Sequence, residues 1–386
     1  MHSLSSNTMK TKLKSLFNEK FNRPATAVYA SAGRINLIGE HTDYNGGFVF
    51  PGAIDKAIMA AIDVNGSDKV RVFSVDINEY AEFGLNECDA PTQSWARYIF
   101  GVCRETIKRG GTVKGFDAVF AGNVPLGAGL SSSAALESCF AFAVNDLFND
   151  NKIDRFELAR IGQSTEHNYC GVNCGIMDQF ASVMGRKGYL MRLDCRSMEF
   201  EYFPFNPVGY DLVLLDSVVK HELADSPYNK RRASCERVAA RLGIETLRDA
   251  SMDALNAIKN DISAEDYIRA KFVIEEKDRV LAVCDALNAG DYDTVGRKMY
   301  ETHTGLSKDY EVSCEELDFL NDIARECGVT GSRIMGGGFG GCTINLVKCD
   351  IRDKFIAEAC KRFNDKYGHE PKVYPVVISD GAHREE

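Results

Sequence analysis

Residues 122–137 read Gly-Asn-Val-Pro-Leu-Gly-Ala-Gly-Leu-Ser-Ser-Ser-Ala-Ala-Leu-Glu, a glycine-rich turn followed at once by an apolar segment, 134–148, with helical spacing. The pattern predicts a loop that leads directly into a helix N-terminus. Unpaired backbone N–H groups and the positive end of the helix dipole favour phosphate at such a junction, and glycines let the backbone approach the ligand closely. The segment therefore predicts a phosphate-binding loop.

The loop differs from a Walker A motif, because no Gly-Lys-Ser/Thr follows the glycines. Without that lysine, the phosphate charge must be met by backbone amides, a metal ion and Ser133. An ordinary helix capped by serine is the alternative, and the density of glycine, proline and serine over 125–133 argues against it. The residues predicted to contact the nucleotide are Gly127, Ala128, Gly129, Leu130, Ser131, Ser132 and Ser133.

A second unusual segment, 34–47, places four chemically active side chains close together: Arg34, Glu40, His41 and Asp43. The asparagines and glycines between them favour a turn, and charged and imidazole groups on a turn suit a binding site. Ionised carboxylates accept hydrogen bonds and sugar hydroxyls donate them, so we expect this loop to hold a polyhydroxylated ligand. Taken alone, the segment is also compatible with a solvated turn.

A third segment, 336–341, has the sequence Gly-Gly-Gly-Phe-Gly-Gly and joins two short apolar runs, 332–335 and 342–347. So many glycines carry a large cost in chain entropy, which is accepted where the backbone must reach positive φ or touch a ligand or another loop. A flexible hairpin is the alternative.

Composition excludes several classes of protein. The 386 residues include 45% hydrophobic residues, enough for substantial cores, and the formal net charge of -10 argues against nucleic acid and anionic membrane surfaces as partners. The 13 scattered cysteines are typical of a reducing compartment. Cys170 and Cys174 have no second pair with zinc-ligand spacing. With no apolar leader and no segment of membrane-spanning length, we expect a cytoplasmic protein without an obligate protein partner.

Periodicity predicts an α+β fold of two domains, 1–205 and 206–386. We expect the active site in the cleft between them. The first is expected to be mostly β, with a phosphate-loop helix, and the second rich in helices with a small sheet. The expected strands are 27–30, 48–54, 57–64, 69–74, 116–121, 211–216, 332–335, 342–347 and 372–378. The expected helices are 132–148, 155–169, 230–242, 264–288, 291–306 and 350–367.

Together, the three segments resemble, in order and separation, the small-molecule kinases named after galactokinase, homoserine kinase, mevalonate kinase and phosphomevalonate kinase. The pattern around 33–44 narrows the resemblance to the galactokinase branch. A fourth match, Cys174-Gly175-Ile176-Met177-Asp178-Gln179, carries the position of the family's catalytic aspartate. The resemblance spans about 25–347, most of the chain.

The resemblance assigns a role to each matched residue. Asp178 falls on the aspartate that accepts the proton of the sugar's anomeric hydroxyl, and Arg34 on the arginine that orients it and steadies developing negative charge. Ser133 and Glu166 match the ligands of a Mg²⁺ ion that bridges the β- and γ-phosphates of ATP. The sugar-binding positions are Glu40, His41, Asp43, Gly175 and Tyr228.

Each role has a plainer alternative. Asp178 could cap a helix, Glu166 could lie on a solvated helix face, and Tyr228 could be a packing residue. One departure from the family pattern is visible: Ala32 stands where the family usually has proline before Gly-Arg, which puts the rigidity of the loop near Arg34 in doubt.

The implied activity is ATP-dependent phosphorylation of the anomeric hydroxyl of α-D-galactose, giving α-D-galactose 1-phosphate and ADP. Two other functions would share most of these motifs: a non-catalytic galactose-sensing protein and a kinase for a related sugar such as N-acetylgalactosamine. A mevalonate-type or homoserine-type kinase would share the phosphate loop but should lack the run 40–43. The run 132–135, Ser-Ser-Ala-Ala, is complete, whereas sensor relatives are altered there.

Overall fold

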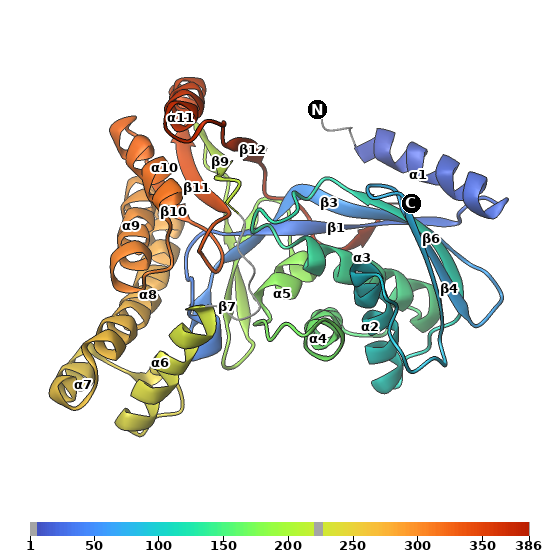
Figure 1. Ribbon diagram of the computed structural model, residues 1–386, viewed down its shortest axis with the longest axis horizontal. Helices are drawn as coiled ribbons and strands as arrows, with labels where there is room; N and C mark the ends of the chain where they lie inside the picture. Colours follow the sequence, from blue (N-terminus) through green and yellow to red (C-terminus); the bar gives the residue numbers. More distant parts are fainter. Residues whose placement is uncertain (1–5, 220–226, 386) are drawn as a thin grey trace.

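The computed structural model describes residues 6–219 and 227–385 and has a mixed α+β architecture (Figure 1). Its strands form three sheets: a six-stranded sheet of order β13-β1-β3-β6-β4-β5, a four-stranded sheet of order β10-β11-β9-β12, and a three-stranded sheet of order β2-β7-β8. The predicted α+β class is therefore confirmed.

The six-stranded sheet is the centre of the first half of the chain. Its strands are β1 (Ala27–Asn36), β3 (Pro51–Val64), β4 (Lys69–Ser74), β5 (Glu79–Gly84), β6 (Phe116–Gly122) and β13 (His383–Arg384). All pairings are antiparallel except β4 with β6. Every residue of β1 is buried, because helices cover both faces of the sheet.

One face is covered by α1 (Ser6–Phe21), whose Leu13 and Phe17 pack against Val28 and Met59. The other face carries α2 (Ser94–Lys108), α3 (Ser132–Asn149), α4 (Arg155–Thr165) and α5 (Met177–Met184) (Figure 1). Successive side chains of a strand point to opposite faces, so Val28 meets α1 whereas Tyr29 belongs to the larger core on the other side.

The second half is built on the four-stranded sheet of β9 (Tyr210–Asp216), β10 (Gly331–Ile334), β11 (Cys342–Lys348) and β12 (Lys372–Val376). Its helices are α6 (Pro227–Leu242), α7 (Met252–Ala257), α8 (Ala264–Asn288), α9 (Tyr292–Thr304), α10 (Glu315–Glu326) and α11 (Arg352–Tyr367). The small third sheet consists of β2 (Phe48–Val49), β7 (Tyr189–Asp194) and β8 (Phe200–Pro204).

The predicted elements are present, but the first half is more helical than expected. The sequence patterns missed α1, α2, α5, α7, α10, β5, β7, β8 and β13. Two expected helices are α-helical only in their first part. Helices α4 and α9 end before the expected boundary, and each is followed by a π-helical turn, Glu166–Cys170 and Gly305–Asp309 respectively. The expected strand 48–54 is divided between β2 and β3. A division of the two domains near residue 206 stays a proposal, and β13 returns from the far end of the chain to pair with β1.

No helix in residues 6–219 and 227–385 is long and apolar enough to cross a membrane. All thirteen cysteines are free thiols.

Candidate active site

The centre of the site is an ion pair between Arg34 on β1 and Asp178 in the first turn of α5. Arg34 Nε donates to Asp178 Oδ1 at 2.8 Å and Nη2 donates to Oδ2 at 2.9 Å, a bidentate geometry. Its third nitrogen, Nη1, donates to the carbonyl of Gly129 in the phosphate loop. Arg34 is buried, whereas the Asp178 side chain is 30% exposed, so the carboxylate is the member of the pair that a ligand can reach.

Charge dominates the chemistry of Arg34. Burial by itself would lower its pKa, but the charge of Asp178 and the hydrogen bonds to it outweigh burial, and the pKa lies above the usual value. The carboxylates of Glu40 and Asp43 act in the same direction. The guanidinium is therefore a fixed positive charge among three acidic side chains.

Two glycines let backbone segments meet at this centre. A Cβ on Gly33 would lie 2.7 Å from the carbonyl of Leu130, and the amide of Arg34 donates to that same carbonyl at 3.1 Å. A Cβ on Gly175 would lie 2.1 Å from Asp43 Oδ2. Any larger residue at either position would push segment 34–47, here called the sugar loop after its predicted ligand, away from the phosphate loop or from the loop before α5. Ala32, at the position of the usual proline, pairs with Ala57 inside β1.

The phosphate loop has the backbone that its sequence predicts. Gly127 and Gly129 both have φ +74°, and Ser131 has φ +58° immediately before α3 begins at Ser132. Ser131 Oγ donates to Asp178 Oδ2. Ala128 and Leu130 are buried and fix the loop to the core.

Ser133 and Glu166 lie together behind this loop. Ser133 Oγ donates to Glu166 Oε1 at 2.9 Å, and Glu166 is buried at the start of the π-helical turn. Burial raises the pKa of Glu166, and the Ser133 hydroxyl opposes this shift. A hydroxyl and a carboxylate in contact suit Mg²⁺, which takes few protein oxygens and completes its octahedron with water and phosphate. No cluster of three or more His, Cys, Asp or Glu side chains within 6–219 and 227–385 could hold a metal alone.

Two buried residues that the sequence patterns did not single out support this pair. Gln179 Nε2 lies between Glu166 Oε1, at 3.4 Å, and Glu137 Oε2, at 3.1 Å. Burial, with the nearby Glu166 carboxyl, raises the pKa of Glu137 well above its usual value. The other oxygen of Glu137 is buried and has no hydrogen-bond partner among the described residues. In the sequence, Glu137 and Gln179 stand out only as the last residues of segments 122–137 and 174–179.

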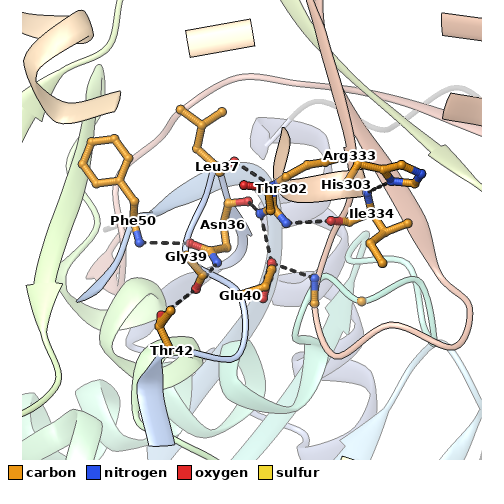
Figure 2. A network of polar contacts seen from close by, with 12 residues as sticks. Asn36, Leu37, Gly39, Glu40, Thr42, Phe50, Thr302, His303, Arg333 and Ile334 are labelled. Carbon is orange, nitrogen blue, oxygen red and sulfur yellow. Dashed lines mark hydrogen bonds and ion pairs between the residues drawn. The ribbon is translucent and has the colours of Figure 1, made fainter. Parts of the chain in front are cut away.

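Glu40 is held by the second half of the chain. Its Oε1 accepts from Arg333 Nη2 at 2.9 Å and from the backbone N–H of Gly336 at 2.9 Å (Figure 2). Arg333 is on β10 and Gly336 belongs to the third glycine-rich segment. The sugar loop and the third motif are thus joined directly by a charged side chain.

His41 belongs to the same loop and has φ +59°. Its Nδ1 shares a hydrogen bond of 2.9 Å with the hydroxyl of Tyr44, which lies 2.8 Å from the hydroxyl of Tyr310. Burial lowers the pKa of His41 to about 3, so the ring is neutral at physiological pH. A neutral imidazole in this position supports the loop or a ligand through hydrogen bonds rather than charge.

Asp43 begins a short 3₁₀ turn, Asp43–Asn45. Burial raises the pKa of Asp43 to about 6, the Tyr44 amide opposes this shift, and the neighbouring Glu40 and Asp178 carboxylates reinforce it. The proton on this carboxyl is therefore easily lost when a ligand offers a hydroxyl donor.

The third glycine-rich segment packs beside the phosphate loop. A Cβ on Gly129 would lie 3.6 Å from the carbonyl of Met335, and one on Gly341 would lie 3.6 Å from the carbonyl of Ala128. Gly338 has φ +84°, and a Cβ there would lie 2.2 Å from the carbonyl of Val312. Its glycines thus serve positive φ, at Gly336, Gly338 and Gly341, and close backbone approach at Gly338, which is the first of the two interpretations offered by the sequence.

The structure brings together most of the residues that the sequence motifs selected. Arg34, Asp178, Gly129 and Ser131 are in direct contact, and Ser133 contacts Glu166. Glu40 and Asp43 face Arg34 closely enough to act on its pKa, and Gly175 abuts Asp43. Tyr228 falls in the first turn of α6, and its side chain lies outside the described residues. The sequence patterns missed Arg333, although it lies just before the third motif. They also missed Glu276 of α8, whose carboxylate accepts from the amides of Gly39 and Glu40.

Family models of known proteins match three parts of the chain. The family model described as GHMP kinases N terminal domain matches residues 97–186, the model described as GHMP kinases C terminal matches 284–366, and the galactokinase galactose-binding signature matches 15–64. A two-domain α+β fold with a glycine-rich phosphate loop and an Arg–Asp pair beside it defines the class as a GHMP-type small-molecule kinase.

Relatives narrow the class to one family. The galactokinase of Thermotoga petrophila is 40% identical over 353 residues, 91% of this chain and 98% of that protein. The galactokinase of Clostridium acetobutylicum is 40% identical over 376 residues, 95% of this chain and 96% of that protein. The chain belongs to the galactokinase family.

Solved structures agree. The structure of Lactococcus lactis galactokinase complexed with galactose superimposes with a TM-score of 0.92 at 33% identity, covering 97% of this chain and 100% of that one. The mevalonate kinase of Methanococcus jannaschii, at 18% identity and a TM-score of 0.67, covers 92% of this chain and 98% of that one and shares the fold.

Proposed function

We propose that this protein transfers the γ-phosphoryl group of ATP to the anomeric hydroxyl of α-D-galactose, giving α-D-galactose 1-phosphate and ADP. The observation that carries the proposal is the bidentate Arg34–Asp178 pair, which is hydrogen-bonded to Gly129 and Ser131 of the phosphate loop. A carboxylate that can take a proton therefore lies beside the place where the loop amides hold phosphate.

The residues divide the work as follows. Glu40, His41, Asp43 and the backbone near Gly175 bind the sugar, with Tyr228 as a further sugar position. Asp178 accepts the proton of the anomeric hydroxyl while the new O–P bond forms and the bond to the ADP oxygen breaks. Phosphoryl transfer depends on positioning and charge stabilisation more than on covalent chemistry, and the buried Arg34 supplies a fixed positive charge at the reacting oxygen.

Magnesium is the expected metal, and Ser133 with Glu166 would hold it. When bound, the ion supplies positive charge to the β- and γ-phosphates of ATP. The two protein oxygens lie in contact, so Glu166 needs little rearrangement to become a ligand beside Ser133. We also propose a cytoplasmic location, in keeping with the free thiols.

The Ser133→Ala variant tests the metal assignment. It removes one oxygen ligand and should weaken Mn²⁺ binding to the protein–nucleotide complex, measured by electron paramagnetic resonance, while the galactose dissociation constant stays unchanged. Ser132→Ala is the matched control in the same turn. Equal Mn²⁺ affinity in all three proteins would refute the role of Ser133.

A coupled assay of ADP release tests the activity. With purified protein, ATP and galactose, we expect turnover that falls by at least about 10² fold in Asp178→Asn, the scale of a lost proton acceptor. The variant should still bind galactose. Galactose binding without ADP release in the wild type would mean a sensor, and faster turnover of N-acetylgalactosamine than of galactose would mean a kinase for the related sugar.

A further inference from the structure

Arg333 is fully buried, and among the described residues it donates to groups of the sugar loop and of its own strand. Its Nε donates to the carbonyl of Leu37 at 2.8 Å, Nη1 to the carbonyl of Ile334 at 2.6 Å, and Nη2 to Asn36 O and to Glu40 Oε1 (Figure 2). A buried guanidinium is costly unless each of its donors is satisfied, and here each of the three nitrogens has a partner. The carboxylate of Glu40 is its one charged partner among the described residues.

The two hydrogen bonds to the Glu40 carboxylate reach the same oxygen. Arg333 Nη2 and the Gly336 amide both donate to Oε1, each at 2.9 Å. In the part of the chain that the structure describes, Oε2 therefore keeps its lone pairs for a ligand. Two donors on one oxygen fix the plane of the carboxylate, and so the direction in which Oε2 accepts.

The backbone at Glu40 is also held by the second half of the chain. Glu276 on α8 is fully buried, and its Oε1 accepts from the amides of Gly39, at 2.8 Å, and Glu40, at 3.3 Å. Its other oxygen accepts from Arg279 Nε and Thr302 Oγ1, both at 2.7 Å. Side chain and backbone of one sugar-loop residue are thus both anchored to the second half of the chain.

We propose that Arg333, with Glu276 as a second anchor, is a positioning residue for galactose binding: it directs Glu40 Oε2 toward a sugar hydroxyl. This inference rests on the proposed function, in which Glu40 binds the sugar. Arg333 itself does not touch the ligand. Arg333 holds the Glu40 carboxylate in one rotamer before the sugar binds, so that binding does not cost the entropy of ordering this side chain.

Three variants and a double-mutant cycle test the inference, with galactose dissociation constants from calorimetry. Glu40→Gln keeps an oxygen that can accept from Arg333 and Gly336 but places an amide N–H₂ where Oε2 stood. We expect galactose binding about 10 to 100 fold weaker. The melting temperature should fall as well, because Arg333 loses its one charged partner among the described residues. Arg333→Lys should weaken galactose by a similar factor, because a lysine cannot reproduce the fork geometry.

The cycle separates positioning from general damage. In the Glu40→Gln background, Arg333→Lys should change galactose affinity by less than about 2 fold, because its effect passes through Glu40. The Michaelis constant for ATP should stay within about 2 fold throughout. Arg269→Lys is the matched control, a buried arginine of α8 that pairs with Glu265 rather than with the sugar loop.

An equal loss from Arg333→Lys in both backgrounds, or a parallel loss of ATP binding, would overturn the inference. If Arg333→Lys does not fold, Thr302→Val replaces it: this near-isosteric change removes only one donor to Glu276, and a loss of about 3 fold in galactose affinity, absent in the Glu40→Gln background, is expected. No loss would again overturn the inference. If Glu40→Gln itself binds galactose normally, it is the proposed sugar role of Glu40 that fails.

Discussion

At the scale of single residues, the Asp178 carboxylate is held by three hydrogen bonds. Both of its oxygens accept from Arg34, and Oδ2 also accepts from Ser131. Three donors fix the orientation of the carboxylate. In the proposed reaction, this geometry suits Asp178 to orient the anomeric hydroxyl as well as to accept its proton.

Arg34→Lys tests how far the guanidinium geometry matters. Lysine keeps the positive charge but cannot bind both oxygens of Asp178 and the Gly129 carbonyl at once. We expect turnover to fall by about 10² to 10³ fold, more than the Michaelis constant for galactose rises, because the interaction strengthens as charge develops. Steady-state kinetics measure both. A raised Michaelis constant with intact turnover would make Arg34 a binding residue only.

The pH dependence of galactose binding should report Asp43. Burial raises the pKa of Asp43 from 3.8 in the reference state to about 6, so between these values the folded protein holds a proton there and the unfolded chain does not. This proton uptake stabilises the ligand-free fold at the acid end, and the contribution is lost as pH rises to about 6.

A sugar hydroxyl that donates to the carboxylate favours the ionised form. Galactose affinity should therefore be constant above about pH 6 and weaken by up to tenfold for each pH unit below it, as calorimetry at several pH values can show. Asp43→Asn should bind more weakly and lose this dependence. The same slope in the variant would assign the titration to another group.

The motif residues of the site could be predicted from the sequence because they are local: a turn, a helix start and a charged loop each leave a mark within about fifteen residues. Arg333 and Glu276 could not, because their importance arises from contacts with Glu40 and Gly39, far away in the sequence. An arginine in a short apolar run of sequence is as typical of a strand-edge residue as of a residue that positions a site. Only the hydrogen-bond partners of Arg333 in the structure show which groups it positions.

At the scale of elements, the third glycine-rich segment shows why a loop can be intolerant of change. Gly338 combines positive φ with a backbone carbonyl, that of Val312, where a Cβ would lie. The same loop supplies the Gly336 amide to Glu40. Any shift that relieves a clash at Gly338 moves that amide.

Gly338→Ala should therefore lose both stability and sugar affinity. Gly290→Ala is the matched control: it also has positive φ, +69°, but its Cβ would meet nothing within 4 Å. We expect Gly290→Ala to cost about 1 kcal/mol of unfolding free energy without changing activity. Gly338→Ala should cost clearly more and raise the Michaelis constant for galactose. Equal melting temperatures for the two variants would contradict this expectation.

The strands were easier to predict than the helices of the first half. Alternation along 70–74 and β-branched residues in 57–64 gave clear signals, and β3 and β4 are present. In contrast, α1 is polar and buries only a narrow stripe with Leu13 and Phe17. Helix α2 contains aromatic and β-branched residues, which also suit strands, and a glycine, which lowers helix propensity. Their helical state is decided by the sheet that they cover.

At the scale of the whole molecule, the two halves share a core and a buried charge network. The largest cluster of buried apolar residues includes Leu214 of β9 and Val280 of α8 together with Ile35 of β1. Arg333 adds bonds to carbonyls of the sugar loop. Separating the two halves would expose apolar surface in both and the buried side chain of Arg333.

The protein should therefore unfold in one cooperative transition. Trp95, the single tryptophan, lies in α2 and reports the first half, whereas α6–α11 contribute much of the far-UV circular dichroism. The denaturant midpoints from the two signals should coincide, and saturating galactose should move both together. Two separate midpoints would show that the halves unfold independently.

The position of β13 has a consequence for synthesis on the ribosome. Arg384 and His383 pair with Tyr29 and Ala30, so an outer strand of the first sheet is supplied by residues translated after the other helices and strands of both halves. During translation, one edge of β1 stays open while these elements are made. Unpaired edges invite association with other chains, so the nascent protein is exposed to such association until β13 emerges.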